Sequence, residues 1–225
     1  GRIGRLTLRR IIEWKDKDLE VVAINDLAAP EMLAYLLKYD SIHGVFNAEV
    51  SHDSTGIIVN GKQIPVYAEK NPAELPWKKH NVDVVLECTG IFATKDKASA
   101  HLTAGAKKVI ISAPAGDDLK TVVFNVNHKI LDSNDKVISN ASCTTNCLAP
   151  LAKTMNDHFG IVAGQMSTIH AYTNSQQLMD TPNPKNKFRT SRAASMNIVP
   201  YSTGAAKASG LVIPELKGKL DGGSQ

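Results

Sequence analysis

The sequence predicts an α/β protein with a doubly wound, mainly parallel sheet, followed by a second region of α+β type. Short apolar, β-branched runs alternate with amphipathic segments through the first part of the chain. A glycine pair opens the first amphipathic segment, as phosphate-binding turns often do. From residue 160 onward the pattern changes to longer strands and a polar loop rich in Pro, Asn and Lys. The alternation is typical of βαβ units with right-handed crossovers, so we expect two domains, residues 1–142 and 143–225.

The elements of the first domain follow from hydrophobic periodicity and turn residues. Residues 1–14 predict a helix because apolar side chains recur near one face, and residues 19–26 predict a buried parallel strand that ends in an acid. Pro30 is placed to open a second helix, over residues 30–40. Residues 56–70 predict a hairpin that turns at an Asn-Gly pair.

Further along, strands and helices continue to alternate. Residues 82–90 and 107–114 predict strands on either side of a helix at 95–106. A short apolar run, KVI, then leads into a helix over residues 143–160, and a strand is expected at 160–170. Pro150 lies inside that last helix, where it is expected to kink the helix or delay its start.

Composition narrows the class of protein. The chain has 225 residues, 43% of them hydrophobic, which is enough for one large or two small cores. Its formal charge is +4, and the basic residues are scattered rather than striped with aromatics, which argues against nucleic-acid binding as the main role. No run approaches the roughly 18 apolar residues of a membrane helix, so no membrane association is expected. Three cysteines, too few and odd in number for a secreted disulfide framework, favour a reducing cytoplasm.

The opening Gly-Arg-Ile-Gly, followed by a helix, matches the second half of the dinucleotide fingerprint G-x-G-x-x-G. Gly1 and Gly4 would let the backbone approach a pyrophosphate at the helix N-terminus, although an ordinary helix-start glycine pair is the alternative. Asp26 supports the fingerprint because it ends the next strand about 20 residues on, where a ribose-binding carboxylate belongs. A carboxylate there repels a 2′-phosphate, so NAD is favoured over NADP. The strand and the glycine expected before this motif are missing from the sequence.

Cys143 and Cys147 raise the question of a metal site, a disulfide or a nucleophile. A structural zinc site needs four ligands, and no second Cys or His pair has a suitable spacing, so no metal is expected. A disulfide is disfavoured in a reducing compartment, which leaves a structural thiol or a nucleophile. Cys143 is placed near the start of the predicted helix, where free N–H groups and the helix dipole stabilise a thiolate. Cys147 lies one turn deeper and is expected to pack.

A nucleophilic thiol needs a base, and His170 is the best candidate among seven histidines. It ends an apolar run and meets the polar segment AYTNSQ, so a strand could project it into a cleft. A structural histidine at a strand end fits the local pattern equally well. Together with the dinucleotide motif, the pair indicates thiol chemistry beside a nicotinamide.

Several motifs carry a resemblance to one enzyme family. GRIGR, IND, YDSIHGVF, ECTGIF, VIISAP, SNASCTTNCLAP, HAYT, IVPYSTGAAKA and VIPELKGKL occur in order along the chain. In these motifs the sequence resembles phosphorylating glyceraldehyde-3-phosphate dehydrogenase. The resemblance implies a Rossmann NAD domain, a catalytic domain with a mixed sheet and a cytoplasmic, glycolytic homotetramer. It also implies oxidation of glyceraldehyde 3-phosphate with NAD and inorganic phosphate to 1,3-bisphosphoglycerate.

The same resemblance assigns roles to individual residues. Cys143 becomes the nucleophile that forms a hemithioacetal and then a thioester, and His170 the residue that activates it. The implied substrate and phosphate contacts are Ser142, Thr144, Thr173, Thr203 and Gly204. The implied cofactor contacts are Gly1, Arg2, Ile3 and Gly4 in the pyrophosphate turn, Asp26 on the adenosine ribose, Lys70 and Ser112, with Thr89 and Gly90 on the nicotinamide side.

Some positions depart from the family pattern. Thr190 stands where many bacterial members carry an arginine near a substrate phosphate, and Ser175 stands where an acid often follows HAYT. The loop TPNPKNK also differs, and the sequence ends at LDGGSQ, where the family supplies a further arginine. These 225 residues alone are therefore expected to be nearly inactive. The alternatives are a dehydrogenase of erythrose 4-phosphate, a Cys-His thiol hydrolase and a protein whose main role is binding.

Overall fold

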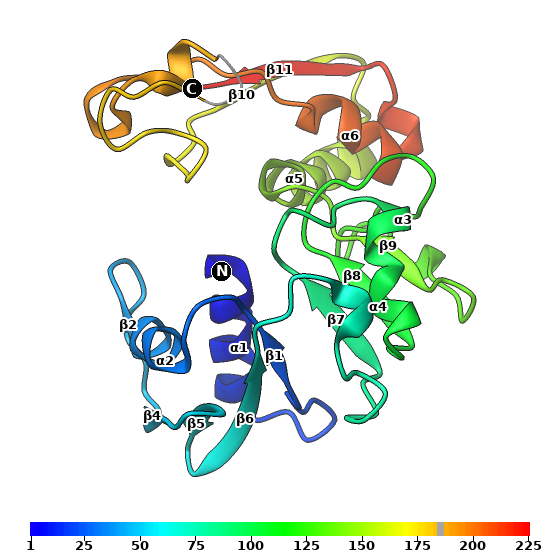
Figure 1. Ribbon diagram of the computed structural model, residues 1–225. Coiled ribbons are helices and arrows are strands. Elements are labelled where there is room, and N and C mark those ends of the chain that lie inside the picture. The colour runs from blue at the N-terminus through cyan, green and yellow to red at the C-terminus, as the bar shows by residue number, and fades with distance from the viewer. Residues whose placement is uncertain (184–186) are drawn as a thin grey trace. The chain divides into compact units, whose positions relative to one another are not determined.

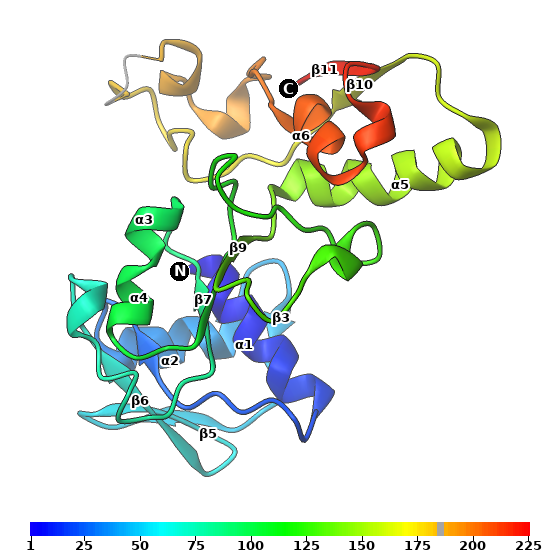
Figure 2. The same ribbon diagram turned by 90° about the vertical axis from the view of Figure 1, so that its right-hand side faces the viewer.

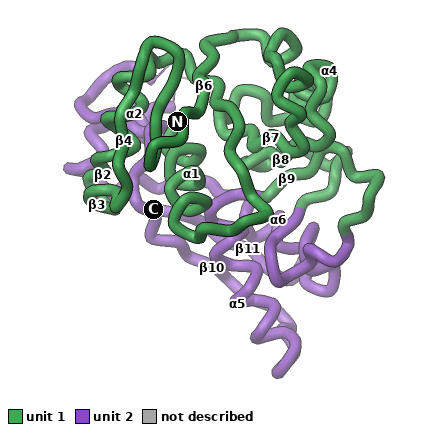
Figure 3. The backbone as a smooth tube through the Cα atoms, turned by 90° about the horizontal axis from the view of Figure 1, so that it is seen from below, with its two compact units in different colours: residues 1–121, 131–140 green, residues 122–130, 141–225 purple. Residues whose placement is uncertain are grey.

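The computed structural model describes residues 1–183 and 187–225 of the chain. These residues form two compact units, which Figure 3 distinguishes by colour. Unit 1 comprises residues 1–121 and 131–140, and unit 2 comprises residues 122–130 and 141–225. Among the described residues, no helix has both the length and the apolar character that crossing a bilayer requires.

The first half of unit 1 combines two helices with a four-stranded mixed sheet (Figure 1). Its strands run in the order β1-β6-β5-β4, with β1 parallel to β6 and the remaining pairs antiparallel. The elements are α1 (Arg2–Trp14), β1 (Ile24–Asn25), α2 (Pro30–Lys38), β2 (Tyr39–Asp40), β3 (Gly44–Val45), β4 (Val50–His52), β5 (Gly56–Val59) and β6 (Lys62–Tyr67).

Both predicted helices and the predicted hairpin are present in this half. The hairpin turns at Asn60 and Gly61, whose φ angles of 50° and 77° are the positive values that a type I′ turn requires. The strand expected over residues 19–26 is shorter than predicted, because only Ile24 and Asn25 pair with β6.

The second half of unit 1 is a three-stranded parallel sheet with two short helices. The strands β7 (Val84–Glu87), β8 (Lys108–Ile111) and β9 (Val137–Ser139) lie in sequence order, as βαβ connections predict. The helix predicted at 95–106 is divided at Ser99 into α3 (Lys95–Ala98) and α4 (Ala100–Thr103). The 3₁₀ helices η1 (Pro72–Glu74) and η2 (His128–Ile130) complete the first 140 residues, η2 belonging to unit 2.

Two apolar clusters hold unit 1 together. One packs Leu8 and Leu37 with Phe46 between the helices and the mixed sheet, and the other surrounds Trp77 and Val109 under the parallel sheet. The buried Arg9 links α1 to α2. Its Nε donates to the carbonyl of Leu37 at 2.8 Å, and one terminal nitrogen donates to the carbonyl of Gly44 at 3.1 Å, so a cation binds one carbonyl in the last turn of α2 and one in β3.

Unit 2 is built on two packed helices, α5 (Cys143–Phe159) and α6 (Ala205–Val212), and the parallel strands β10 (Gly164–Thr168) and β11 (Leu220–Ser224). Short 3₁₀ helices η3 (Arg189–Ser191), η4 (Ala194–Met196) and η5 (Pro214–Leu216) lie between them. The alternative of a late start is wrong: α5 begins at Cys143 and continues through Pro150 without a break (Figure 2). Ala149 and Ala152, on either side of the proline, are buried with Val212, and this packing holds the helix.

Gly105 offers a test of unit 1. Its φ is +107°, and a Cβ there would lie 2.6 Å from the Cβ of Lys78 and 2.8 Å from the Lys78 backbone nitrogen. We expect Gly105→Ala to lower the free energy of unfolding by about 2 to 4 kcal/mol, through backbone strain and overpacking together. Urea denaturation measures the loss. The control is Gly44→Ala, with φ +70° and nothing within 4 Å of the added Cβ, which should cost about 1 kcal/mol. Equal losses for the two variants would contradict the packing argument.

Candidate active site

Cys143 is the first residue of α5, as the sequence predicted. Ala141, with a φ of 58°, turns the chain before the helix, and Ser142 caps it. The Ser142 Oγ accepts the backbone N–H of Thr145 at 3.0 Å and lies 2.7 Å from the Thr145 hydroxyl, which is fully buried. The thiol of Cys143 therefore stands exposed at a rigid helix N-terminus, where the helix dipole favours negative charge.

The His170 ring faces this thiol. Its Nε2 lies 3.2 Å from the Cys143 Sγ, and its Nδ1 lies 2.6 Å from the carbonyl oxygen of Ala171. A carbonyl can only accept, so Nδ1 carries a proton and Nε2 is left to accept the thiol proton. The backbone N–H of His170 also donates to the carbonyl of Gln225, at 2.8 Å, which fixes the segment beyond β10. The predicted nucleophile and base are thus brought together with the base oriented by a third group.

The two groups shift each other's ionisation. Partial burial raises the pKa of the Cys143 thiol, but the hydrogen bonds with His170 and Thr144 and the charge of the imidazolium lower it by more, so the net pKa lies below the ordinary thiol value. The bond to the Ala171 carbonyl raises the pKa of His170, and the hydrogen bond to Cys143 raises it further. Both shifts favour a thiolate beside an imidazolium.

The predicted substrate residues of unit 2 have different surroundings. Thr144 lies with its Oγ1 3.9 Å from the Cys143 sulfur. Thr173 bonds within its own loop, to the Ser175 hydroxyl at 3.0 Å. The Thr203 Oγ1 accepts the N–H of Ala205 at 3.2 Å, and Gly204 is the N-cap of α6. Of this set, only Thr144 and the capping Ser142 are tied directly to the Cys143 turn.

Thr190, where the sequence departs from the family pattern, is only 2% exposed. Its hydroxyl accepts from the Asn183 amide at 3.1 Å and donates to the Lys187 carbonyl at 3.1 Å. The threonine is thus part of the packing of its loop. Part of the neighbouring loop TPNPKNK, residues 184–186, lies outside the described residues.

In unit 1, the predicted ribose acid and Lys70 lie at one edge of the mixed sheet. Asp26 directly follows β1, and the exposed Lys70 lies just beyond β6, which is parallel to β1. The Asp26 Oδ2 is 3.1 Å from the amino group of Gly1, so the start of α1 meets the end of β1. Gly1 caps α1 without any side-chain hydrogen bond, and the first turn holds no acid, which suits an anion.

The remaining predicted cofactor residues follow the parallel strands. Thr89 and Gly90 come after β7 and Ser112 after β8, and the Ser112 N–H donates to the Glu87 carbonyl at 3.0 Å. A Cβ on Gly4 would lie 3.5 Å from the Cys88 Cβ, so the first turn of α1 lies beside the end of β7. The structure therefore gathers most of the predicted cofactor residues of unit 1 around the start of α1.

The side chains of Arg2 and Ile3, in the first turn of α1, have surroundings unlike those of the other predicted cofactor residues. The Arg2 guanidinium binds both oxygens of Asp40, at 2.7 and 3.1 Å, and these bonds hold the pKa of that carboxyl well below its usual range. The Ile3 side chain is 54% exposed. The Arg2 side chain is thus directed to Asp40, and any contact with a pyrophosphate falls to its backbone.

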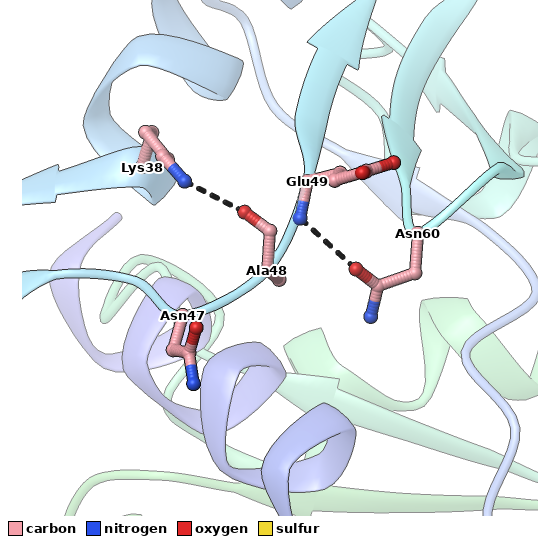
Figure 4. Close-up of a pocket in the computed structure, with 5 residues that line it drawn as sticks. All are labelled: Lys38, Asn47, Ala48, Glu49 and Asn60. Atoms are coloured by element: carbon pink, nitrogen blue, oxygen red, sulfur yellow. Dashed lines mark hydrogen bonds between the residues drawn. The ribbon is translucent and has the colours of Figure 1, made fainter.

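Other features of the described residues carry no site. Cys147 is exposed, so the expectation that it packs is wrong: the inward face of α5 is occupied by Thr145, Ala149 and Ala152. Within the described part of the chain, no group of His, Cys, Asp and Glu side chains is arranged to hold a metal ion. A polar hollow beside α2 is shown in Figure 4, where the Lys38 Nζ donates to the Ala48 carbonyl at 2.7 Å and the Glu49 N–H to Asn60. None of the predicted site residues lines it.

Sequence reasoning missed three groups that orient site residues. The Ala171 carbonyl sets the His170 ring, Asp40 binds Arg2, and Glu87 accepts both the N–H and the hydroxyl of Thr89. A backbone carbonyl leaves no mark in a sequence. The acid at the end of a buried strand, Glu87, was the one signal that could have been followed.

The chain matches known proteins along its whole length. The family model described as "Glyceraldehyde 3-phosphate dehydrogenase, NAD binding domain" matches residues 1–95, and the one described as "Glyceraldehyde 3-phosphate dehydrogenase, C-terminal domain" matches residues 142–225. Curated proteins named glyceraldehyde-3-phosphate dehydrogenase are 62% identical in Clostridium pasteurianum and 60% identical in Clostridium acetobutylicum, over 225 residues. A third, from Lactobacillus delbrueckii subsp. bulgaricus, is 58% identical over 228 residues. Each alignment covers 100% of this chain and 67 to 68% of the relative. The predicted fold class and the prediction of NAD as cofactor are confirmed.

The lowered pKa of Cys143 leads to a labelling prediction. Alkylation follows the thiolate fraction, so iodoacetamide should modify Cys143 at neutral pH well before Cys88, whose thiol pKa is raised by burial, and before Cys147. His170→Asn removes the partner that lowers the pKa, so the alkylation profile of Cys143 should move to higher pH. Mass spectrometry of each cysteine over a pH series measures both effects. Equal labelling of the three cysteines, or an unchanged profile in the variant, would refute the pairing.

Proposed function

The chain belongs to the glyceraldehyde-3-phosphate dehydrogenase family, and we propose that it oxidises D-glyceraldehyde 3-phosphate with NAD and inorganic phosphate to 1,3-bisphosphoglycerate. The observation that carries the mechanism is the 3.2 Å contact between the Cys143 sulfur and the His170 Nε2. An exposed thiol at a helix N-terminus, paired with an oriented imidazole, is the arrangement of an activated nucleophile.

The chemistry proceeds on the sulfur of Cys143. The thiolate adds to the aldehyde carbon, and the resulting alkoxide takes the proton of the His170 imidazolium to give a hemithioacetal beside a neutral imidazole. His170 Nε2 then removes the hydroxyl proton as the carbon loses hydride, which leaves a thioester on Cys143. NAD, when bound, supplies the acceptor for that hydride. Inorganic phosphate attacks the thioester carbon, the C–S bond breaks, and the acyl phosphate leaves with Cys143 again a thiolate beside the imidazolium.

The cofactor residues of unit 1 fit NAD. The uncapped first turn of α1, opened by two glycines, offers backbone N–H groups to a pyrophosphate. Asp26 would accept hydrogen bonds from ribose hydroxyls at the same edge, Thr89 and Gly90 would border the nicotinamide side, and Ser112 would make a further cofactor contact. Lys70, exposed beyond β6, would make a further contact. The anion-binding turn and the ribose acid distinguish this chain from a Cys-His thiol hydrolase, which needs neither.

On the substrate side we assign Ser142, Thr144, Thr173, Thr203 and Gly204 to the binding of the substrate and phosphate oxygens. Gly204 is the N-cap of α6 and has no side chain, so an anion can approach the start of that helix, where the Ala205 N–H already donates to the Thr203 hydroxyl. Thr203 thus adds a hydroxyl at that helix start.

We further propose a cytoplasmic homotetramer. The three cysteines are free thiols, which agrees with a reducing compartment. Unit 2 carries apolar side chains that are more than 80% exposed, as subunit interfaces do before assembly. They are Val162, Ile169, Leu178, Phe188, Met196 and Ile198.

Replacement of the base tests the proposed chemistry. His170→Asn should slow NADH production by at least about a hundredfold, the usual scale for removal of a positioned acid-base group. The assay follows NADH absorbance in the complete enzyme with glyceraldehyde 3-phosphate, NAD and phosphate. Erythrose 4-phosphate is run in parallel, and faster turnover of that aldehyde would overturn the substrate assignment. Near-normal hydride transfer in the variant would remove His170 from the mechanism.

Replacement of the ribose acid tests the cofactor assignment. NADP should be a much poorer substrate than NAD, because the Asp26 carboxylate repels a 2′-phosphate. Asp26→Gly should narrow the gap between the two cofactors by removing that repulsion. The measurement is kcat/KM for each cofactor in both proteins. Comparable values for the two cofactors in the unmodified enzyme would contradict the role of Asp26.

A further inference from the structure

Behind the Thr89–Gly90 turn lies a buried carboxylate that the reaction does not use. Glu87, the last residue of β7, is 4% exposed. Its Oε1 accepts the backbone N–H of Thr89 at 2.7 Å and the Thr89 hydroxyl at 2.5 Å. The Thr89 Oγ1 in turn accepts the N–H of Ile91 at 3.0 Å. Two donors of this exposed turn are therefore held by one carboxylate oxygen, and the Ile91 N–H is linked to it through the Thr89 hydroxyl.

The other oxygen of Glu87 faces a buried histidine. The His101 Nε2, on α4, lies 3.0 Å from the Glu87 Oε2, and the His101 Nδ1 lies 3.0 Å from the Trp77 indole nitrogen. An indole N–H can only donate, so Nδ1 must be the acceptor and the ring proton must be on Nε2, which donates to Glu87. His101 is 4% exposed and Trp77 5% exposed.

The aromatic surroundings hold the His101 ring in place. Trp77 stacks on it with ring centroids 6.2 Å apart, and Phe92 meets it edge-on at 6.4 Å. Burial raises the pKa of Glu87, but the hydrogen bonds from His101 and Thr89 lower it by more, so the group remains a carboxylate. A buried carboxylate with all of its hydrogen bonds made holds its partners firmly. Removal of one partner lowers the stability of the fold, because it leaves a buried charge without compensation.

We propose that Trp77, His101 and Glu87 form a positioning chain that holds the Thr89–Gly90 turn in the conformation that binds NAD. This inference rests on the proposed function, which assigns that turn to the cofactor. The turn itself is exposed and Gly90 has a φ of 73°, so its shape depends on the anchor beneath it. Each link in the chain has a fixed donor and acceptor, from the indole to the turn.

The fixed direction of these hydrogen bonds gives a sharp test. In Glu87→Gln, the amide must present its NH₂ group either to the Thr89 donors or to the His101 Nε2–H, so two donors face each other in both orientations. His101 cannot relieve the conflict by moving its proton to Nδ1, because the Trp77 N–H occupies that side. Trp77→Phe removes the indole donor and lets the proton move.

Isothermal titration calorimetry of NAD into the complete enzyme and its variants measures the Kd for NAD. We expect E87Q to weaken NAD binding roughly tenfold, the scale of one lost buried hydrogen bond. Trp77→Phe alone should weaken it much less, and the double variant should bind NAD more tightly than E87Q alone. A purely structural role predicts the opposite, with losses that add.

His80→Gln is the matched control. The His80 Nε2 is hydrogen-bonded to the Tyr67 hydroxyl at 2.6 Å in the same aromatic cluster, outside the chain that runs from Trp77 to Glu87. Its replacement should lower Tm and leave the Kd for NAD unchanged. If E87Q does not fold, Glu87→Asp is the second variant, because it keeps the charge but is too short to reach both His101 and Thr89.

The outcomes separate the two proposals. Unmodified enzyme that binds no NAD overturns the proposed function. Unmodified enzyme that binds NAD, with E87Q or Glu87→Asp binding equally well, overturns the positioning chain alone. Additive losses in the double variant overturn it as well, whereas tighter binding by the double variant than by E87Q supports it.

Discussion

The contact between the Cys143 sulfur and the His170 imidazole is the central interaction of unit 2, because the helices and strands around it hold these two groups together. Two separate parts of the unit must be held to make it. The sulfur is fixed by the start of α5, which Ser142 caps and which Ala149 and Ala152 anchor in the core. The imidazole is fixed by the bond of its backbone to Gln225, at the end of the β10-β11 pair. The thiolate of Cys143 is stabilised because the helix start and the imidazole are both held next to the sulfur.

In unit 1, too, exposed site residues are held in place by other parts of the fold. The predicted cofactor residues lie at strand ends and at the start of α1, and buried partners set their conformation. Arg9 ties α1 to the end of α2, and Glu87 ties the Thr89 turn to the cluster around Trp77. The residues proposed to contact ligands are mostly exposed, while those that orient them are buried. Changes at the buried set are therefore expected to alter binding as well as stability.

The sequence predicts the fold and the position of Cys143 at a helix start well because both follow from local rules. Strand-turn-helix order places Cys143 at a helix start, and an acid after a β-branched run marks Asp26. The errors arise where tertiary packing decides. Pro150 is accommodated because the helix around it is held by the core, and Cys147 is exposed because smaller side chains occupy the inward face. The anchors Ala171 and Glu87 depend on contacts that no local pattern records, although Glu87 ends a strand that was correctly predicted.

The two histidines with decisive roles show how one nitrogen of the ring sets the function of the other. In His170, Nδ1 donates to a carbonyl, so Nε2 is free to exchange a proton with an exposed thiol. In His101, Nδ1 accepts from an indole, so the proton is confined to Nε2 and is given permanently to a buried carboxylate. The first arrangement leaves a basic site facing solvent and substrate, and the second leaves none. The same side chain is therefore placed to accept a proton in unit 2 and to donate one in unit 1, and the difference follows from whether its Nδ1 partner accepts or donates.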